Sequence, residues 1–253
     1  MFKIENLFYC PVKSISFTDS QSLKVLKNKG INNDRIFAFV YNLDLDKIKI
    51  FQNDPQSRKL NNFITLKNSP ELNQYNFIFI KNKLVLRKKL EEIISVDPYS
   101  KNERVILSNK ISQLLKKSKK INLLIDKKNP FFDTMPNNSI SLINKNSIND
   151  FENKILTNIE FQRFRANIYI SGPNAWEERN WLGKTIKINN VHFLVSDEIP
   201  RCSATNLKPN TDNITINLPN QLKKTYDHTN MGVYLIPLND GEISIDNQIN
   251  LND

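Results

Sequence analysis

The pentapeptide Ile199-Pro200-Arg201-Cys202-Ser203 places an arginine directly before one of the two cysteines of the chain. The preceding run from Val191 to Val195 alternates well enough to predict a β-strand. A proline fixes its own φ angle and biases the residue before it toward extended geometry. We therefore expect Arg201 and Cys202 to lie at a turn that leaves a strand, where side chains can point into a cleft.

An arginine beside a cysteine suggests a reactive thiol. A guanidinium group favours the thiolate, which is the nucleophilic and metal-binding form. A free cysteine titrates near ~8.5, and a neighbouring cation can lower that pKa by about a unit or more. The alternative is that Cys202 is a small buried apolar residue, as most free cysteines are. The pentapeptide alone leaves both interpretations open.

Length and composition indicate a soluble globular protein. The chain has 253 residues, of which 39% are hydrophobic and 25% are charged, which suits one large domain or two intimate ones with a real core. No apolar run approaches the ~18 residues of a transmembrane helix, and the first residues lack a signal-peptide pattern. We therefore expect a cytoplasmic protein with no membrane partner.

The small number of cysteines and histidines limits the metal chemistry. Two cysteines cannot make a disulfide framework, and alone they cannot hold an iron–sulfur cluster. Two histidines leave little material for a zinc site.

The formal net charge of +10 admits an anionic ligand or a nucleic acid. The excess is mostly lysine spread along the chain, and the densest run, 116–120, falls at the end of a helix predicted over 109–119. Positive charge at that end complements the helix dipole. A solvated helix end therefore explains this run better than nucleic-acid contact does. A non-catalytic basic barrel that binds nucleic acid is the third and weakest function hypothesis.

Short strands dominate the secondary structure that we predict. In the N-terminal part they cover 2–9, 22–26, 34–41, 47–51, 63–67, 75–80 and 83–88. Further along they cover 121–125, 139–143, 184–189, 191–195, 213–217, 233–237 and 242–245, with a second helix beginning at an N-cap, Ser147. This spacing predicts a mainly β (α+β) fold, a barrel or a sandwich with a few short helices. We expect a β-rich region at 1–97 packed against a second domain at 98–253.

Two pieces of the N-terminal region carry positive charge near a turn. Pro11-Val12-Lys13-Ser14 places a lysine and a hydroxyl just after a proline, and Asp34-Arg35 begins a predicted strand. Each alone is typical of a surface lysine or a structural ion pair. Together they could supply a cationic floor for a phosphate.

The stretch from Phe161 to Gly172 is predicted as a strand. Alternation would direct Phe164, Ala166, Ile168 and Ile170 into a core, and Arg163, Arg165, Asn167 and Tyr169 to the other face. The guanidinium group of Arg165 and the side-chain amide of Asn167, placed on one face, could bind the same ligand. The alternative is an ordinary solvent face.

In their order along the chain, these motifs resemble those of MOSC-domain proteins. They are Tyr9-x-Pro11-Val12-Lys13-Ser14, Gly30-x-x-x-Asp34-Arg35, Phe164-Arg165-x-Asn167-Ile168-x-Ile170-Ser171-Gly172 with Trp181, Arg201-Cys202-x-x-Thr205 and Gly232-Val233-Tyr234. The branch they resemble has a β-barrel N-terminal MOSC region and includes the mitochondrial amidoxime reducing component. The resemblance runs from about residue 3 to residue 249 and implies a β-barrel MOSC core.

The resemblance implies a molybdenum cofactor, molybdopterin, with Cys202 as the catalytic residue and the ligand of molybdenum. The implied cofactor-binding residues are Lys13, Ser14, Arg35, Thr134, Met135, Arg165, Asn167, Arg201 and Tyr234. The implied activity is the reduction of N-hydroxylated small molecules by oxygen transfer at the metal. The chain lacks the four cysteines of a ferredoxin-type domain, so we expect electrons from a separate donor protein. Pyridoxal phosphate binding applies only as a general label of the family.

The chain departs from the family pattern at several positions. Arg165-Ala166-Asn167 replaces an Arg-Pro-Asn and keeps both polar groups, Met135 replaces a hydroxyl found in some relatives, and Pro200 stands where some have a small polar residue. Ile245-Asp246-Asn247 keeps only the acid of a closing Gly-Asp. In sulfurase relatives the same cysteine is proposed to carry sulfur. A persulfide carrier for the assembly of metal–sulfur centres is therefore the second function hypothesis.

Overall fold

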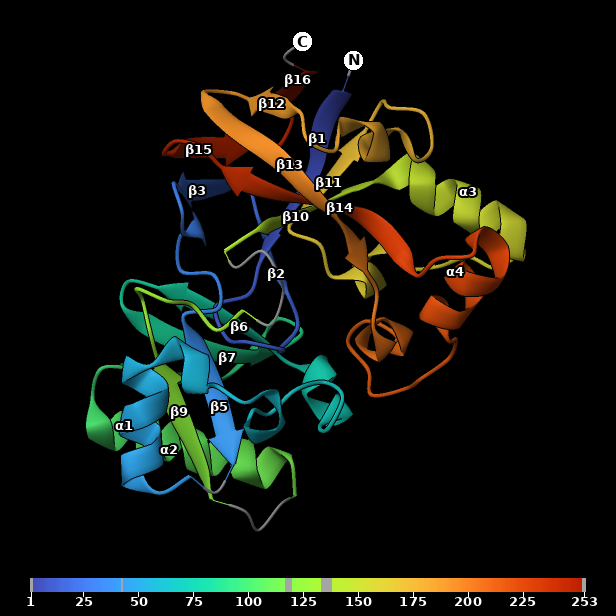
Figure 1. Cartoon of the computed structure of the whole chain (residues 1–253). Helices are drawn as coiled ribbons and strands as arrows, with labels where there is room; N and C mark the ends of the chain where they lie inside the picture. Colours follow the sequence, from blue (N-terminus) through green and yellow to red (C-terminus); the bar gives the residue numbers. More distant parts are fainter. Residues whose placement is uncertain (1, 42, 117–119, 133–137, 252–253) are drawn as a thin grey trace.

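A closed ring of β-strands forms the larger of two lobes in the computed structural model, which describes residues 2–41, 43–116, 120–132 and 138–251. Within these residues the ring has seven strands, in the order β1-β11-β10-β14-β13-β12-β16 and back to β1 (Figure 1). They are β1 (Phe2–Tyr9), β10 (Ile140–Asn144), β11 (Ile168–Ser171), β12 (Thr185–Ile188), β13 (Val191–Pro200), β14 (Asn230–Pro237) and β16 (Gln248–Leu251). The pair β10–β11 is parallel and the other six are antiparallel. The prediction of a mainly β fold with a barrel core is confirmed.

The barrel interior is filled by aliphatic and aromatic side chains from alternate strand positions. Ile4, Ile168, Phe193 and Val233 are each fully buried there. A second sheet, β15-β3-β4, is made of β15 (Gly241–Ser244), β3 (Ser22–Leu26) and β4 (Gly30–Ile31), and its buried side chains Leu23, Val25, Ile31 and Ile243 join the same core. The short strand β2 (Thr18–Ser20) pairs with the C-terminal end of β1, from Leu7 to Tyr9.

Gly232 permits a close approach between two barrel strands. Its φ is +80°, and a Cβ atom there would lie 2.3 Å from the carbonyl oxygen of Leu142 on β10. A larger residue would therefore force β14 away from β10.

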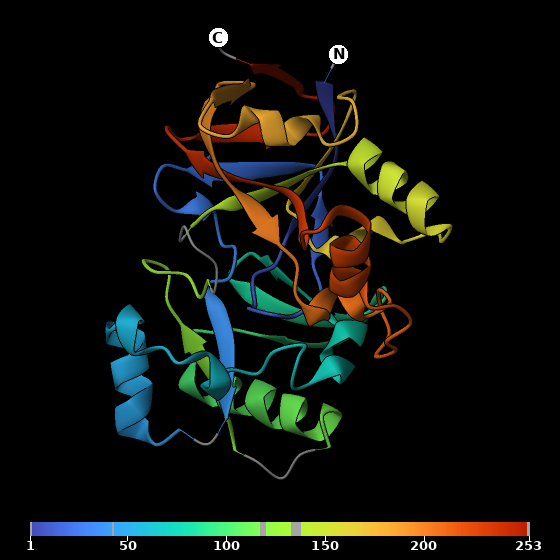
Figure 2. The ribbon, with the colours of Figure 1, turned by 45° about the vertical axis from the view of Figure 1, so that its right-hand side comes forward.

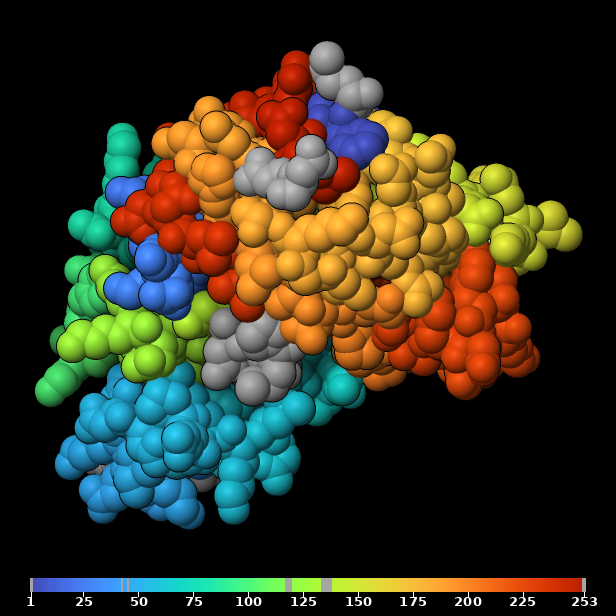
Figure 3. Space-filling model, turned by 45° about the horizontal axis from the view of Figure 1, so that its top comes forward, coloured from blue at the N-terminus to red at the C-terminus, as the bar shows by residue number. Residues whose placement is uncertain are grey.

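Among the described residues, the smaller lobe contains two small sheets and two α-helices (Figure 1). Strands β5 (Phe37–Tyr41) and β9 (Ile121–Ile125) pair antiparallel, and β6 (Asn76–Ile80), β7 (Lys83–Lys88) and β8 (Glu91–Val96) form a meander. Helices α1 (Leu45–Asn53) and α2 (Lys101–Leu114) lie at the end of the lobe away from the barrel (Figure 2). In space-filling form, α1 and the segment after it project below the barrel strands (Figure 3).

Two helices, α3 (Lys145–Ile155) and α4 (Leu218–Tyr226), pack on one side of the barrel (Figures 1 and 2). Helix α3 follows β10 directly, and the side chain of Asn144 caps it by accepting from the N–H of Asn146 at 3.1 Å. The predicted N-cap at Ser147 is wrong, because its hydroxyl instead donates to the buried carboxylate of Glu178 at 2.9 Å. Trp181, which follows Glu178, is buried in the barrel core and stacks on Phe2.

Several predicted elements differ from the structure. The predicted strand at 47–51 lies in α1, which Asp44 caps by accepting from the N–H of Lys47. The predicted strands at 63–67 and 213–217 are irregular apart from single β-bridges at Phe63 and Ile214, and α4 follows the second of them. Helix α2 begins at Lys101 rather than near 109 and ends at Leu114. Residues 117–119 of the lysine run lie outside the described residues.

The first strands of the chain contribute to both lobes. Strand β1 closes the barrel between β11 and β16, whereas β5 pairs with β9 in the smaller lobe. The predicted division at residue 97 stays a prediction. Within the part of the chain that the structure describes, no helix has the length and apolar character needed to cross a bilayer.

Candidate functional site

Cys202 lies where the barrel meets the smaller lobe. Strand β13 ends at Pro200, so Arg201 and Cys202 occupy the turn that the sequence predicts. A short 3₁₀ turn over Ser203–Asn206 follows, and the carbonyl oxygen of Cys202 accepts hydrogen bonds from the N–H and the hydroxyl of Thr205 at 3.0 and 2.8 Å. The backbone of Cys202 is thus fixed from the C-terminal side.

The Cys202 side chain is exposed and forms no disulfide. The alternative that Cys202 is a buried apolar residue is therefore wrong. That description fits Cys10, which is fully buried.

Arg201 fixes the same turn from the N-terminal side. Its guanidinium group donates to the carbonyl oxygen of Phe164 at 2.7 Å and to that of Met231 at 2.9 Å, and it lies 5.9 Å from the centroid of the Phe164 ring. Burial lowers the pKa of Arg201, while the neighbouring tyrosines and Cys202 act in the opposite direction. A guanidinium group stays protonated in proteins. A fixed positive charge therefore stands beside the thiol.

Two adjoining cavities open at Cys202. The smaller, of about 150 Å³, is formed mainly by barrel residues. The larger, of about 790 Å³, extends toward the smaller lobe. The residues that line both are Arg35, Arg165, Pro200, Cys202, Ala204 and Tyr234.

The cavities bring together eight of the ten predicted site residues. Lys13 and Ser14 line the larger cavity, Asn167 and Arg201 line the smaller one, and Arg35, Arg165, Cys202 and Tyr234 line both. The remaining two, Thr134 and Met135, lie outside the described residues.

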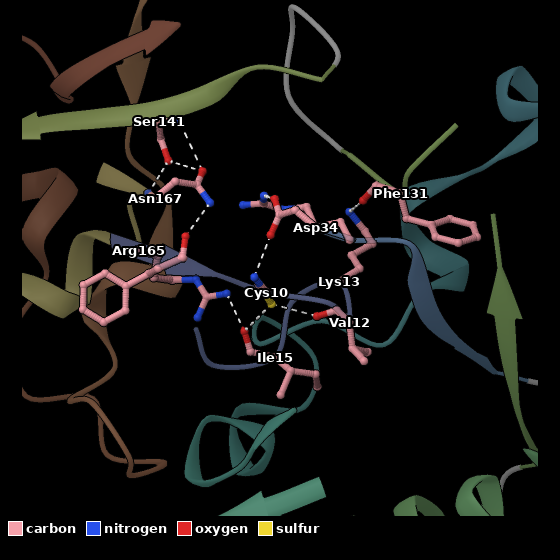
Figure 4. A network of polar contacts seen from close by, with 11 residues as sticks. Cys10, Val12, Lys13, Ile15, Asp34, Phe131, Ser141, Arg165 and Asn167 are labelled. Atoms are coloured by element: carbon pink, nitrogen blue, oxygen red, sulfur yellow. Dashed lines mark hydrogen bonds and ion pairs between the residues drawn. The ribbon is translucent and has the colours of Figure 1, made fainter. Parts of the chain in front are cut away.

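The loop after β1 supplies the cationic floor (Figure 4). Lys13 is buried, and its ammonium group donates to the carbonyl oxygen of Phe131 at 3.3 Å. Ser14 and Arg35 both adopt left-handed backbone conformations, with φ of 62° and 52°. The guanidinium group of Arg35 forms an ion pair with Asp34, whose other oxygen accepts from the N–H of Cys10 at 2.6 Å.

Arg165 brings a third positive charge to this floor. Its guanidinium group donates to the carbonyl oxygen of Ile15 at 2.8 Å and lies 5.0 Å from the centroid of the Phe17 ring. The guanidinium group of Arg35 lies 5.2 Å from the same centroid. Two cations gathered around one ring repel each other, so an anion bound between them would be stabilised.

The predicted strand over 161–172 is wrong in its first half. Residues Phe161–Phe164 form a 3₁₀ helix, Arg165 has a left-handed φ of 53°, and the strand covers only Ile168–Ser171. Arg163 points to the carbonyl oxygen of Asn206, at 2.9 Å, and does not line the Cys202 cavities. The positive φ at Arg165 breaks the alternation and turns its side chain to the cavity.

Asn167 lines the smaller cavity with a side chain that is already hydrogen-bonded (Figure 4). Its oxygen accepts from the hydroxyl and the N–H of Ser141 at 2.8 and 3.2 Å, and its amide nitrogen donates to the carbonyl oxygen of Phe8 at 3.1 Å. Asn167 therefore joins β10 to β1 and shapes the wall of the cavity.

Ser139 is a cavity residue that the sequence did not single out. It is 4% exposed and lines the smaller cavity, and its hydroxyl has no hydrogen-bond partner among the described residues. An unpaired buried hydroxyl costs about 1–3 kcal/mol, so it marks a place for a polar ligand atom. A serine at the start of a predicted strand carries no sequence signal for this role.

The described residues contain no group of three or more histidine, cysteine, aspartate or glutamate side chains placed to hold a metal ion. Among the described residues that line the two Cys202 cavities, Cys202 is the one residue of these four types, so its thiol is the candidate metal ligand.

One family model and several solved structures are similar to this chain. The family model described as the MOSC domain matches residues 131–250. Among solved structures, the YUAD protein from Bacillus subtilis is 12% identical, covers 98% of this chain and 94% of its own, and has a TM-score of 0.45. YiiM from Geobacillus stearothermophilus is 18% identical over 45% of this chain and 54% of its own, with a TM-score of 0.37. No curated protein matches the chain.

Proposed function

Residues 131–250 are a MOSC domain, and from this premise we propose that the chain binds a molybdenum cofactor and acts as an oxidoreductase. MOSC domains are associated with proteins that bind this cofactor or carry sulfur. The observation that carries the proposal is the exposed thiol of Cys202 at the meeting point of two cavities lined by Lys13, Arg35 and Arg165.

The side chains present fit the chemistry of the cofactor. Its terminal phosphate needs fixed cations and donors, which Lys13, Ser14 and Arg35 would supply. The unpaired hydroxyl of Ser139 and the guanidinium group of Arg165 would hydrogen-bond its polar pterin part. A soft thiolate suits molybdenum, and Cys202 would be the protein ligand.

The chain itself would bind and orient, and the bound cofactor would supply oxygen-atom transfer that reduces N-hydroxylated small molecules. Arg201 would hold the Cys202 turn through its hydrogen bonds to the carbonyl oxygens of Met231 and Phe164 and would place a fixed positive charge next to that turn. Electrons would come from a donor outside these 253 residues, since two cysteines cannot hold an iron–sulfur cluster.

The test is the molybdenum and pterin content of protein purified from a host that makes the cofactor. We expect about one molybdenum per chain, lost in Cys202→Ser and retained in Cys10→Ser. The two substitutions are chemically identical, and only one lies on a cavity wall. Equal metal content in wild type and Cys202→Ser would remove Cys202 as the ligand.

Arg165→Ala tests the cationic floor. Its guanidinium group donates to the carbonyl oxygen of Ile15 and lines both Cys202 cavities, so we expect the pterin content to fall more than the thermal midpoint does. Unchanged pterin content would remove Arg165 from the proposed cofactor site.

The exposure of the Cys202 thiol also supports the second hypothesis, a persulfide carrier. A sulfur carrier needs an accessible thiolate and no resident metal. Protein that contains no molybdenum and no pterin but releases cyanide-labile sulfur, lost in Cys202→Ser, would favour sulfur transfer over the oxidoreductase.

A further inference from the structure

A third cavity, of about 360 Å³, lies behind Arg165. Among its described lining residues, Arg165 alone is shared with the two Cys202 cavities. Arg165 thus adjoins both this cavity and the proposed cofactor site, and the remaining lining serves no role in the proposed function.

Aromatic rings line much of this cavity. Phe8, Phe17 and Tyr169 contribute to the lining, and the Phe8 and Tyr169 rings meet edge to face with centroids 5.8 Å apart. Tyr169 is 1% exposed, and its hydroxyl donates to the carbonyl oxygen of Phe161 at 2.9 Å and accepts from the N–H of Ala166 at 3.1 Å, so Tyr169 holds the Phe8 ring in place and presents little surface of its own. Phe8 and Phe17 are only partly buried. Such a surface suits a flat aromatic ligand.

Three charged groups line the same cavity. Lys89, in the turn between β7 and β8, and Arg165 are positive, and Asp19 on β2 is negative. In the described part of the chain, Lys89 and Asp19 form no ion pair, and both side chains are exposed. The sum of the three charges is +1, which favours a ligand with one negative charge and disfavours a dianion facing Asp19.

The rim also offers uncommitted hydrogen-bonding groups. The side-chain amides of Gln162 and Asn210 line the cavity and have no hydrogen-bond partner among the described residues. They can donate to and accept from the polar edge of a ligand.

We propose that this cavity binds a planar aromatic monoanion, such as an aromatic carboxylate. The partly exposed rings of Phe8 and Phe17 would contact its plane, Arg165 and Lys89 would hold its carboxylate, and the two amides would contact its polar edge. The volume lies within the usual range for small-molecule sites. The inference goes beyond the proposed function and does not require a bound cofactor.

The experiment is a titration of the full chain with 2-naphthoate, followed by its fluorescence and by saturation-transfer NMR. The uncharged 2-naphthamide has the same ring and serves as the control ligand. We expect saturable binding of naphthoate, with naphthamide weaker by about tenfold, because it loses the charge-assisted contacts. No saturable binding, or equal binding of the two ligands, would overturn the proposal.

Variants locate the site. Lys89→Gln should weaken naphthoate by about fivefold, as expected for an exposed charge, and Gln162→Trp should block binding by filling the cavity. Both residues are exposed, so the fold is unaffected. Lys67 is exposed and lines only the larger Cys202 cavity, so Lys67→Gln should leave the affinity unchanged. If Lys67→Gln weakens naphthoate and Lys89→Gln does not, the ligand occupies the Cys202 cavity and the proposal is wrong.

The outcome is separable from that of the proposed function. Naphthoate binding is measured on protein without molybdenum, and molybdenum content is measured without naphthoate. Either result can therefore fail while the other stands.

Discussion

The two cysteines occupy similar places in the sequence and opposite environments in the structure. Cys10 follows the end of β1 and precedes a proline, and Cys202 follows the end of β13, two residues after a proline. Both belong to the turns that build the junction of the two lobes. Cys10 is fully buried, whereas Cys202 is exposed.

The difference shows that nearby cations do not by themselves make a thiol reactive. Burial raises the pKa of Cys10 to about 11, although Arg165 and Arg35 both lie close enough to act in the opposite direction. The thiol of Cys10 donates to the carbonyl oxygens of Val12 and Ile15 at 2.9 and 3.2 Å (Figure 4). Desolvation of the thiolate outweighs the guanidinium charges. Solvent exposure is therefore at least as important as the adjacent arginine in distinguishing Cys202 from Cys10.

The largest expected effect is on alkylation by iodoacetamide. In native protein at pH 8, Cys202 should react and Cys10 should be protected by about a thousandfold or more, because its labelling requires the fold to open. Peptide mass spectrometry over time measures both rates. Denaturation should make the two rates similar. Fast labelling of Cys10 in the native state would remove the contrast between the two turns.

The second effect is on the pH dependence of stability. The pKa of Cys10 is raised from 9.0 to about 11 in the folded state. The native state therefore keeps a proton that the unfolded state releases, and the free energy of unfolding falls as the pH rises from about 9 to about 11. Below about pH 9 both states hold the proton, and Cys10 causes no change of the free energy of unfolding with pH.

Urea unfolding of wild type and Cys10→Ala at pH 8 and pH 10.5 measures this contribution. The decline should be larger in wild type by about 2 kcal/mol, which is most of the ~2.7 kcal/mol that corresponds to a shift of about two pKa units. Other groups titrate alike in both proteins, so the difference isolates Cys10. Parallel declines would show that the thiol of Cys10 is not perturbed by burial.

At neutral pH, alanine substitutions should separate the cysteines by a smaller amount. Cys10→Ala removes a buried atom and a donor to two carbonyl oxygens, so we expect a loss of about 1–2 kcal/mol in the free energy of unfolding. Cys202→Ala should change it by less than about 0.5 kcal/mol. Equal losses measured by urea unfolding would contradict the structural role of Cys10.

The smallest effect concerns the hydroxyl that fixes the Cys202 turn. Thr205→Val removes the hydrogen bond to the carbonyl oxygen of Cys202 and should cost about 1 kcal/mol or less. Thr211→Val is the matched control, since its exposed hydroxyl makes the same type of bond to Lys208 at 2.9 Å. A greater loss in the control would show that the buried Thr205 bond does not hold the turn.

The alternation of apolar and polar residues predicted most strands of this fold. It failed for segments in which helix-capping residues point to a helix instead. The alternating residues of β5, β7 and β9 were predicted within a few positions. The run 47–51 also alternates, but the capping contact of Asp44 and the burial of Phe51 favour α1. Helix α4 carries its own signals, a capping Asn217 and a proline in the first turn, which the predicted strand over 213–217 obscured.

The candidate site was predictable wherever a motif sits on one short segment. Lys13, Arg35 and Cys202 were identified in this way, and their convergence follows from the pairing of distant strands. The unpaired hydroxyl of Ser139 and the Phe17 ring between two arginines are properties of the packed state. The left-handed backbone conformation of Arg165 could not be predicted, because the residues on both sides of it alternate as they would in a regular strand.

The closure of the barrel has a consequence for the order of assembly during translation. Strand β1 leaves the ribosome well before its partners β11 and β16, so the register that joins Phe2 to Ile249 forms only after β16 has emerged. Contacts between such distant residues form slowly, because a long loop must close. A nascent chain halted before β16 exposes unpaired edges of β1 and β12 to neighbouring chains. Strand β16 therefore closes the barrel and also covers the edges of β1 and β12 through which neighbouring chains could pair.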